Sequence, residues 1–299
     1  MTYSPPSARP GRRKTFFFVT VARALLAVIF VFPLVFMVVS SFKPDRQIFA
    51  DLGSFAAFVP TGHLSLDNYA ALFVRVPIGR FFLNSVVVSG VTVVLGLIVN
   101  SMAAFALSRT RLRGRRVILV LIIATLTVPF EALALPLVWW VNQLPWLTLH
   151  GFTLTLTTGW LDTYQVQIVP FIANAFSIFL FYQYFQSIPR ELDEAAKLDG
   201  AGWFRIYRSV VIPLCGPAIA TVAILTFLPA WNSYLWPLMV VQSQELRPVM
   251  VGIDYFFQLN VSWGQLLAYA SLITVPVIAL FVVFQRAFVN SIAATGVKG

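Results

Sequence analysis

The chain has 299 residues, of which 59% are hydrophobic and only 11% are charged, and its formal net charge is +10. A soluble domain would carry about twice this charged fraction, so the composition excludes an ordinary soluble protein. A single Cys excludes an internal disulfide, and two His far apart in the sequence argue against a metal centre. The basic charge alone does not indicate nucleic-acid binding, because Lys and Arg collect on the cytoplasmic side of membrane proteins.

Long apolar runs recur along the whole chain, and each is long enough to supply the roughly 20 residues that a helix needs to cross a bilayer. We predict six membrane-spanning helices, at residues 17–41, 80–107, 117–141, 166–187, 214–241 and 265–288. The runs are too long and too continuously apolar for barrel strands, so the predicted class is an all-α polytopic membrane protein. The first run is too long for the apolar part of a cleaved signal peptide.

The positive charges predict the orientation. Of the 21 Lys and Arg residues, sixteen fall in one set of connections and five in the other. The positive-inside rule therefore predicts that both termini are cytoplasmic. We divide the chain into a basic cytoplasmic segment, 1–15, a six-helix transmembrane domain, 16–290, and a cytoplasmic tail, 291–299. Attraction to the anionic lipid bilayer explains the basic stretch "TRLRGRR", and no nucleic-acid partner is expected.

The densest charge cluster of the chain lies in "PRELDEAAKLDGAGWFRIYRSVVIPL". We predict two short helices there, with Pro189 in the first turn, an ion pair between Asp193 and Lys197, and a break at Gly200 and Gly202. The second helix has an apolar face at helical spacing, formed by Trp203, Ile206, Tyr207, Val210 and Val211. A solvated loop with a helix lying on the membrane surface is the plain alternative. The small residues beside the break favour close approach to another surface.

This stretch resembles the EAA loop of ABC-importer permeases. The matching positions are Glu194, Ala195, Ala196, Gly200, Ile212 and Pro213. Residues 84–109, 176–189 and 226–238 and the tail "QRAFVNSIAATGVKG" are similar to carbohydrate-uptake permeases, in particular the maltose-transporter type. In the tail, Ala294-Thr295-Gly296 departs from the more usual run of small residues, which leaves only details of the tail in doubt.

The resemblance implies a type I ABC-importer permease fold and a coupling loop, 188–213, that docks into a cytoplasmic ATPase. The residues it makes candidates for coupling are Glu194, Ala195, Ala196, Asp199, Gly200, Arg205 and Pro213. The end of the tail, 297–299, is a secondary candidate contact. The sequence contains no Gly-x-x-x-x-Gly-Lys-Ser/Thr loop, so this chain is not expected to be an enzyme or to bind a cofactor. ATP and Mg would be used by the partner ATPase.

The implied partners are a second homologous permease, two ATP-binding cassette subunits and an extracytoplasmic sugar-binding protein, in a prokaryotic inner (plasma) membrane. Four residues are candidates for the translocation path: Glu131, Trp231, Asn232 and Tyr234. Trp231 beside Asn232 suits a sugar ring through stacking and hydrogen bonds, although in the maltose-type family the partner permease holds most of the sugar. We expect Asn84, Asn100 and Asn174 to form hydrogen bonds between helices. The sequence does not distinguish disaccharides, oligosaccharides and polyol phosphates.

A secondary transporter and a membrane-embedded enzyme are the two alternative functions. Glu131 is the only acidic residue deep in a predicted span, so it is a functional candidate or a structural residue at a helix break. A secondary transporter coupled to ions through Glu131 would need inverted repeats, which the sequence does not show. A membrane-embedded enzyme would need convergent acid, base or metal-binding residues, and the few His and Cys do not supply them.

Overall fold

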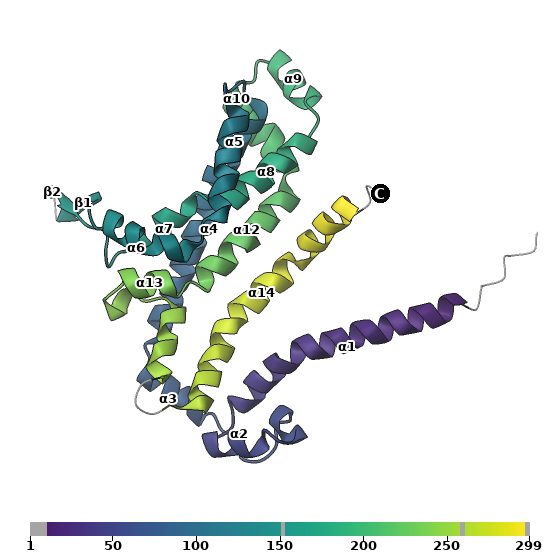
Figure 1. The fold of residues 1–299 in the computed structure, drawn as a ribbon, viewed down its shortest axis with the longest axis vertical. Coiled ribbons are helices and arrows are strands. Elements are labelled where there is room, and N and C mark those ends of the chain that lie inside the picture. Colours follow the sequence, from purple (N-terminus) through teal and green to yellow (C-terminus); the bar gives the residue numbers. More distant parts are fainter. Residues whose placement is uncertain (1–10, 151–152, 258–260, 297–299) are drawn as a thin grey trace, which may run out of the picture. The chain divides into compact units, whose positions relative to one another are not determined.

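The structure is a computed structural model that describes residues 11–150, 153–257 and 261–296. The chain forms two compact units (Figure 1). Unit 1 comprises Met1–Val76 and Tyr255–Leu272, and unit 2 comprises Pro77–Asp254 and Ile273–Gly299. The tail contact predicted at 297–299 lies outside the described residues.

Unit 1 is built from helices and one 3-10 turn: α1 (Gly11–Ser40), α2 (Asp45–Asp51), η1 (Phe55–Phe58), α3 (Asp67–Arg75) and the first part of α14 (Trp263–Gly296). Unit 2 begins with α4 (Ile78–Arg109), α5 (Arg115–Ala124), α6 (Phe130–Val141), β1 (Pro145–His150), β2 (Thr153–Thr158), α7 (Tyr164–Ile172) and α8 (Ala175–Ser187). It continues with α9 (Glu191–Leu198), α10 (Trp203–Ile206), α11 (Ile212–Leu214), α12 (Gly216–Trp231), α13 (Leu235–Val240) and the rest of α14.

Four stretches of the described chain are long and apolar enough to cross a membrane: Phe17–Ser40, Ile78–Arg109, Tyr164–Ser187 and Trp263–Phe284. They match four of the predicted spans. The other two predicted spans, 117–141 and 214–241, are not single straight helices. Arg115–Thr127 meets Phe130–Val141 at 102°, and Trp203–Leu214 meets Gly216–Trp231 at 84°. The described residues therefore hold four candidate spans, or up to six if each bent pair is one span, and the side on which the termini lie stays a prediction.

Local sequence explains these interruptions. Pro129 precedes α6 in an extended conformation, and a residue before proline is itself disfavoured in a helix, so α5 and α6 cannot join smoothly. The 84° bend lies at Cys215, between α11 and α12, and therefore at the predicted start of the span 214–241. A separate break lies near the end of that span, because α12 ends at Trp231 and α13 begins at Leu235. Hydropathy alone does not report either break.

One departure from the all-α prediction lies in the connection between the predicted spans 117–141 and 166–187. β1 and β2 pair as an antiparallel hairpin, with Pro145 opposite Thr158 and His150 opposite Thr153. The alternation of Thr and Leu in "TLTLTT" has the period of two that a strand requires. A short hairpin on a helical body leaves the helical class of the protein unchanged.

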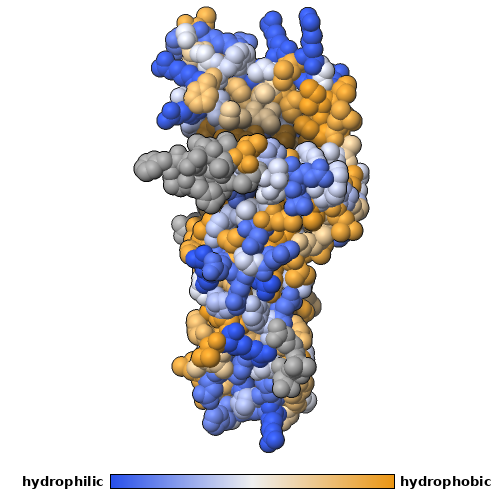
Figure 2. All heavy atoms as spheres, turned by 90° about the vertical axis from the view of Figure 1, so that its left-hand side faces the viewer, coloured by the Kyte–Doolittle hydropathy of each residue, from blue (hydrophilic) through white to orange (hydrophobic). Residues whose placement is uncertain are grey.

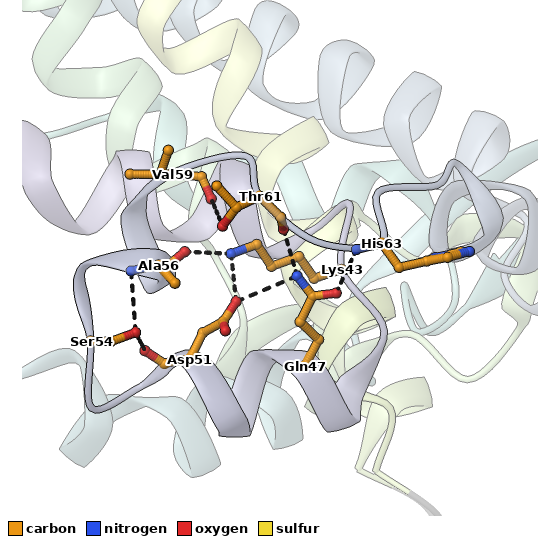
Figure 3. Close-up of polar contacts among 8 residues, drawn as sticks. All are labelled: Lys43, Gln47, Asp51, Ser54, Ala56, Val59, Thr61 and His63. Atoms are coloured by element: carbon orange, nitrogen blue, oxygen red, sulfur yellow. Dashed lines mark hydrogen bonds and ion pairs between the residues drawn. The ribbon is translucent and has the colours of Figure 1, made fainter.

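A polar network orders the segment of unit 1 that follows α1 (Figure 3). Lys43 is completely buried, and its Nζ donates hydrogen bonds to the Asp51 carboxylate at 2.9 Å and to the Ala56 carbonyl. The hydrogen bond from Lys43 lowers the pKa of Asp51. Gln47 adds bonds to the Thr61 carbonyl and from the His63 amide. The connection between the predicted spans 17–41 and 80–107 is thus a folded element, ordered by the hydrogen bonds of Lys43 and Gln47.

In unit 2, α4 is the central helix, and α7, α8 and α12 pack against it (Figure 1). The predicted amide contacts hold for Asn84 and Asn100. Asn100 Nδ2 donates to the Ile172 carbonyl at 2.9 Å, and its Oδ1 accepts from the Asn174 amide at 2.8 Å. The Asn174 side chain instead caps α8, because its Oδ1 accepts from the Ser177 amide. The side chains of Asn84 and Asn100 therefore connect different elements, whereas the side chain of Asn174 caps the N-terminus of α8.

Candidate functional site

The predicted coupling loop forms two short helices around a sharp break. α9 begins at Glu191, and its first turn carries the acidic residues expected near a helix N-terminus. Pro189 lies before the capping residue Arg190, outside the first turn predicted for it. Gly200 has a φ of +78°, and the amides of Gly200 and Ala201 donate to the carbonyls of Lys197 and Ala196. These are the two bonds of a Schellman motif, which glycine favours because it adopts a positive φ without strain.

The inner face of α9 is fixed by a buried ion pair. Arg109, the last residue of α4, lies 2.9 Å from the Asp193 carboxylate, and the side chains are 2% and 7% exposed. The same guanidinium donates to the carbonyls of Phe185 at 2.8 Å and Ile188 at 2.9 Å, where α8 ends. Arg109 therefore joins α4, the end of α8 and α9 at one point.

The local pair predicted between Asp193 and Lys197 is replaced by this tertiary contact. The Lys197 ammonium lies 4.0 Å from the centre of the Trp203 ring, in a cation–π arrangement across the break. Asp193 instead faces Arg109, whose buried guanidinium would be costly without a counter-charge.

The outer face of the loop carries the predicted coupling residues. Ala196 is half-buried against the core of unit 2, and the other candidates are exposed: Glu194, Ala195, Asp199, Gly200, Arg205 and Pro213. Apolar residues are exposed beside them, with Leu198 at 90% and Phe204 at 66%. At this end of unit 2, at the top of Figure 2, hydrophilic and hydrophobic side chains lie next to each other on the surface. The face thus combines charges with uncovered apolar side chains, as docking surfaces do.

The second helix of the loop has the predicted apolar face. Ile206 and Val211 are completely buried, and the Tyr207 hydroxyl lies 2.8 Å from Ser101 Oγ on α4. Arg205 and Arg208 are exposed, as expected. Residues Tyr207–Val211 form a π-helical turn, which the pattern of apolar residues did not predict. Both short helices are therefore attached to α4.

A second candidate site is a cavity of about 420 Å³ within unit 2. It lies among α4, α6, α7, α12 and α13. Its lining residues are Val88, Thr92, Phe130, Gln167, Pro170, Phe171, Ala173, Asn174, Leu225, Thr226, Pro229, Ala230, Ser233, Pro237 and Pro248. None of these side chains is ionisable.

The four predicted path residues lie next to this cavity in sequence but do not line it. Trp231 is 1% exposed, its Nε1 donates to the Ile273 carbonyl at 3.1 Å, and its ring stacks on Phe227. Asn232 Nδ2 donates to the Leu228 carbonyl of its own helix. Their roles in transport stay predictions, and the contacts seen for Trp231 are those of a core residue.

Tyr234 and Glu131 lie on exposed positions. The Tyr234 hydroxyl is 2.8 Å from the Asp254 carboxylate. Glu131 is in the first turn of α6, directly after the break that follows α5, where the helix dipole stabilises a carboxylate. This placement fits the structural explanation of Glu131 at a helix break, and its role in transport also stays a prediction.

The sequence analysis did not identify the buried arginine that anchors α9 or the polar residues that line the cavity. Arg109 counted only as one of many cytoplasmic charges, and its burial was not foreseen. Gln167 could have been found, since a glutamine inside a predicted span is a signal of the same kind as Glu131. Thr92 and Thr226 carry no such signal, because Thr is common in membrane helices.

Membrane-length helices, a charged loop anchored on a helical core and a cavity between helices define an integral membrane transport subunit. Comparison with known families agrees. Residues 92–293 match the family described as "Binding-protein-dependent transport system inner membrane component", and the chain belongs to this family. It is therefore an inner-membrane permease component of an ABC transport system.

Characterised relatives align over nearly their whole length. The chain is 34% identical to the arabinooligosaccharide transport permease AraQ of Halalkalibacterium halodurans, over 94% of this chain and 95% of that protein. It is 28% identical to the trehalose/maltose permease MalG of Thermococcus litoralis, over 92% and 94%. It is 31% identical to the lactose permease LacG of Rhizobium radiobacter, over 89% and 91%.

A solved structure shares the fold. A chain of a bacterial ABC transporter that imports the acidic polysaccharide alginate superposes with a TM-score of 0.76 at 24% identity. The match covers 95% of this chain and all of that one. The predicted ABC-importer permease fold is therefore confirmed.

Proposed function

We propose that this chain is one permease subunit of an ATP-driven sugar importer and forms half of its translocation path. The relatives that support a sugar substrate carry arabinooligosaccharides, trehalose and maltose, or lactose, according to their names. These solutes are all carbohydrates, so a carbohydrate is the substrate class proposed here. The cavity without ionisable side chains is consistent with this class.

The coupling loop, 188–213, is proposed to transmit the movement of a cytoplasmic ATPase. The observation that carries this proposal is the two-sided construction of α9. Its inner side is tied to α4 and α8 through Arg109 and Asp193, and its outer side presents Glu194, Ala195 and the exposed Leu198. Because the inner side of α9 is bonded to α4 and α8, a displacement of α9 by a protein bound to its outer side would also displace these helices.

The remaining partners complete the proposed assembly. ATP and Mg would bind to two separate ATPase subunits, because this chain contains no phosphate-binding loop. A second homologous permease would form the other half of the path. An external sugar-binding protein is supported by the family description and by a related alginate transporter solved in complex with a periplasmic protein.

A co-purification experiment tests the coupling surface. The chain is tagged in its native membrane and purified gently, and stoichiometric partners are identified for the wild type, for Glu194→Lys and for Glu245→Lys. Glu245 is a matched control, because it is exposed and its carbonyl accepts hydrogen bonds from Arg80 and Asn84, at the opposite end of α4 from Arg109. We expect the ATPase with the wild type and with Glu245→Lys, and its loss from Glu194→Lys.

Two outcomes would contradict the proposal. Equal recovery of the ATPase by both Lys variants would show that the outer face of α9 is not the docking surface. Sugar uptake that continues after the ATPase gene is removed would favour a secondary transporter instead.

A further inference from the structure

A second cavity of unit 2 lies between the end of α4, the start of α5 and α9, and its lining is strongly basic (Figure 1). Its volume is about 430 Å³. Five cationic and two acidic side chains line it: Arg109, Arg111, Arg115, Arg190, Lys197, Asp193 and Glu194. Arg109 and Asp193 neutralise each other in the buried ion pair described above. The rest of the lining therefore sets four cations against one carboxylate.

Two of the four remaining cations have no protein partner. The side chains of Arg111 and Arg115 form no hydrogen bond or ion pair with any described residue. Arg190 donates to the Ser108 carbonyl at 3.3 Å, and Lys197 is held by its cation–π contact, so both stay beside the cavity with other donors free. Like charges that are held together repel each other, so four cations around one cavity favour an anionic ligand.

The helical period places Arg115, but not Arg116, on the side of α5 that faces the cavity. Arg115 shares a face with Leu119 and Ile122, which pack against the core of unit 2. Arg116 is exposed and does not line the cavity. Acidic residues are favoured in the first turn of a helix, yet the first turn of α5 contains none and no side chain caps it. The start of α5 therefore adds positive charge where a helix already attracts anions.

An apolar surface begins directly beyond the cavity. Ile118 and Leu121 follow Arg115 at intervals of three residues, so they are successive neighbours along the helix surface, and they are 41% and 62% exposed. No residue of α5 is buried. α5 also begins one of the two bent candidate spans, so the cavity lies at the end of an apolar segment. A basic cavity followed by an apolar helix surface matches a ligand with an anionic head and a hydrocarbon chain.

We propose that this cavity binds the phosphate group of an anionic phospholipid. Arg111, Arg115 and Arg190 surround the phosphate, and Lys197 adds a fourth positive charge. Guanidinium groups suit this ligand, because their paired N–H donors match two phosphate oxygens. The acyl chains lie along the exposed apolar residues of α5. Such a site differs from the general attraction of basic residues to a bilayer, because it requires particular arginines.

The bound phosphate connects the coupling loop to α5. Arg190 and Lys197 lie at the two ends of α9, whereas Arg111 and Arg115 lie in the turn after α4 and at the start of α5. A phosphate bonded to both pairs bridges the two elements and reduces the repulsion between them. The lipid is therefore expected to stabilise the position of α9.

The test is native mass spectrometry of the purified complex in a neutral detergent. Phosphatidylglycerol and phosphatidylcholine with identical acyl chains are the two probes, because they differ in the net charge of the headgroup. We expect the wild type to bind phosphatidylglycerol more tightly than phosphatidylcholine. Arg115→Gln removes a guanidinium that has no protein partner, so its affinity for phosphatidylglycerol should fall about tenfold, the size of one lost charge-assisted hydrogen bond. The melting temperature of the lipid-free complex should not change.

Arg116→Gln is the matched control, because it removes the same charge from the adjacent position outside the cavity. A neutral micelle has no charged surface, and salt screens exposed charges beyond about 8 Å. We therefore expect the affinity of Arg116→Gln for phosphatidylglycerol to stay within about twofold of the wild type. Arg111→Gln should repeat the loss seen with Arg115→Gln.

A competition measurement separates a lipid from a free phosphate compound. Glycerol 3-phosphate carries the phosphate without acyl chains, so it should not displace phosphatidylglycerol when the two are present at equal concentration. Displacement under these conditions would identify a free phosphate compound as the ligand and would overturn the lipid site.

Two other results would overturn the inference. One is equal affinity of the wild type for the two lipids, and the other is an equal loss in Arg116→Gln and Arg115→Gln. The measurement uses neither ATP nor sugar. A failure of this inference therefore leaves the proposed transport function intact, and a failure of that function leaves the lipid site intact.

Discussion

The two ends of α4 each hold a loop of unit 2, but by different chemistry. Near the start of the helix, Asn84 donates to the carbonyls of Glu245 at 2.7 Å and Arg247 at 2.9 Å, and accepts from the Tyr164 hydroxyl. At the far end, Arg109 pairs with Asp193 and donates to two carbonyls at the end of α8. The two residues are 25 positions apart, about 38 Å along the helix.

The difference shows how each loop is specified. Asn84 binds backbone carbonyls of its loop, which every residue possesses, so that contact fixes the loop's conformation without fixing its sequence. Arg109 needs one carboxylate in one place, because a buried guanidinium without its partner is costly. The neutral end can therefore tolerate substitutions in the loop that the charged end cannot.

Substitution of Arg109 is expected to cause the largest loss in the free energy of unfolding. Arg109→Met leaves Asp193 buried without its cation and removes the bonds to the carbonyls of Phe185 and Ile188. Breaking a buried pair from one side costs about 3–5 kcal/mol, so we expect a loss of this order in the free energy of unfolding. Denaturant unfolding of the purified complex would measure it, and co-purification of the ATPase would report on the position of α9.

A double variant separates the charge from the shape. Arg109→Met combined with Asp193→Leu removes both charges, and most of the stability should return, because apolar residues can replace a buried pair at little cost. Double and single variants of equal stability would contradict the view that the unpaired Asp193 carboxylate causes the loss.

The sequence predicted the helical class and the two short helices with a break within 188–213, because these depend on local patterns. Apolar runs report membrane helices, and the Gly200 break follows from the need for a positive φ. The break before Phe130 and the break between Trp231 and Leu235 were missed, because hydropathy averages over interruptions inside a predicted span. The hairpin at 145–158 was missed because short alternating strands give a weak signal in an apolar chain.

The anchors of the site depend on tertiary structure. Arg109 stands among Arg111, Arg113, Arg115 and Arg116, and composition cannot show which of the five is buried. Asp193 had a partner available on its own helix, so local reasoning chose Lys197. Thr92, Gln167 and Thr226 line the cavity from three helices separated by long stretches of chain, so their common location depends on the folded structure.

Substitutions at the Asn84 end of α4 should lower the free energy of unfolding by less than Arg109→Met does. Asn84→Leu removes three hydrogen bonds without leaving a charge, so we expect a loss of about 2–3 kcal/mol in the free energy of unfolding. Tyr164→Phe removes only one of the three bonds and should cost about 1 kcal/mol. Both values come from the same denaturant unfolding measurement. A loss from Asn84→Leu as large as that from Arg109→Met would remove the distinction between the two ends.

The smallest effect is expected at the break after α9, and it tests whether the charged end also needs a fixed helix terminus. Gly200→Ala places a Cβ at a φ of +78°, where no atom lies within 4 Å, so the cost is conformational and about 1 kcal/mol. Gly202→Ala is the matched control, because its φ of −72° suits alanine and its surroundings are equally open. Unfolding of both variants, with ATPase recovery as a second measurement, gives the comparison. If the two Ala variants behave alike, the ion pair alone positions α9; if only Gly200→Ala weakens ATPase recovery, the terminus and the ion pair act together.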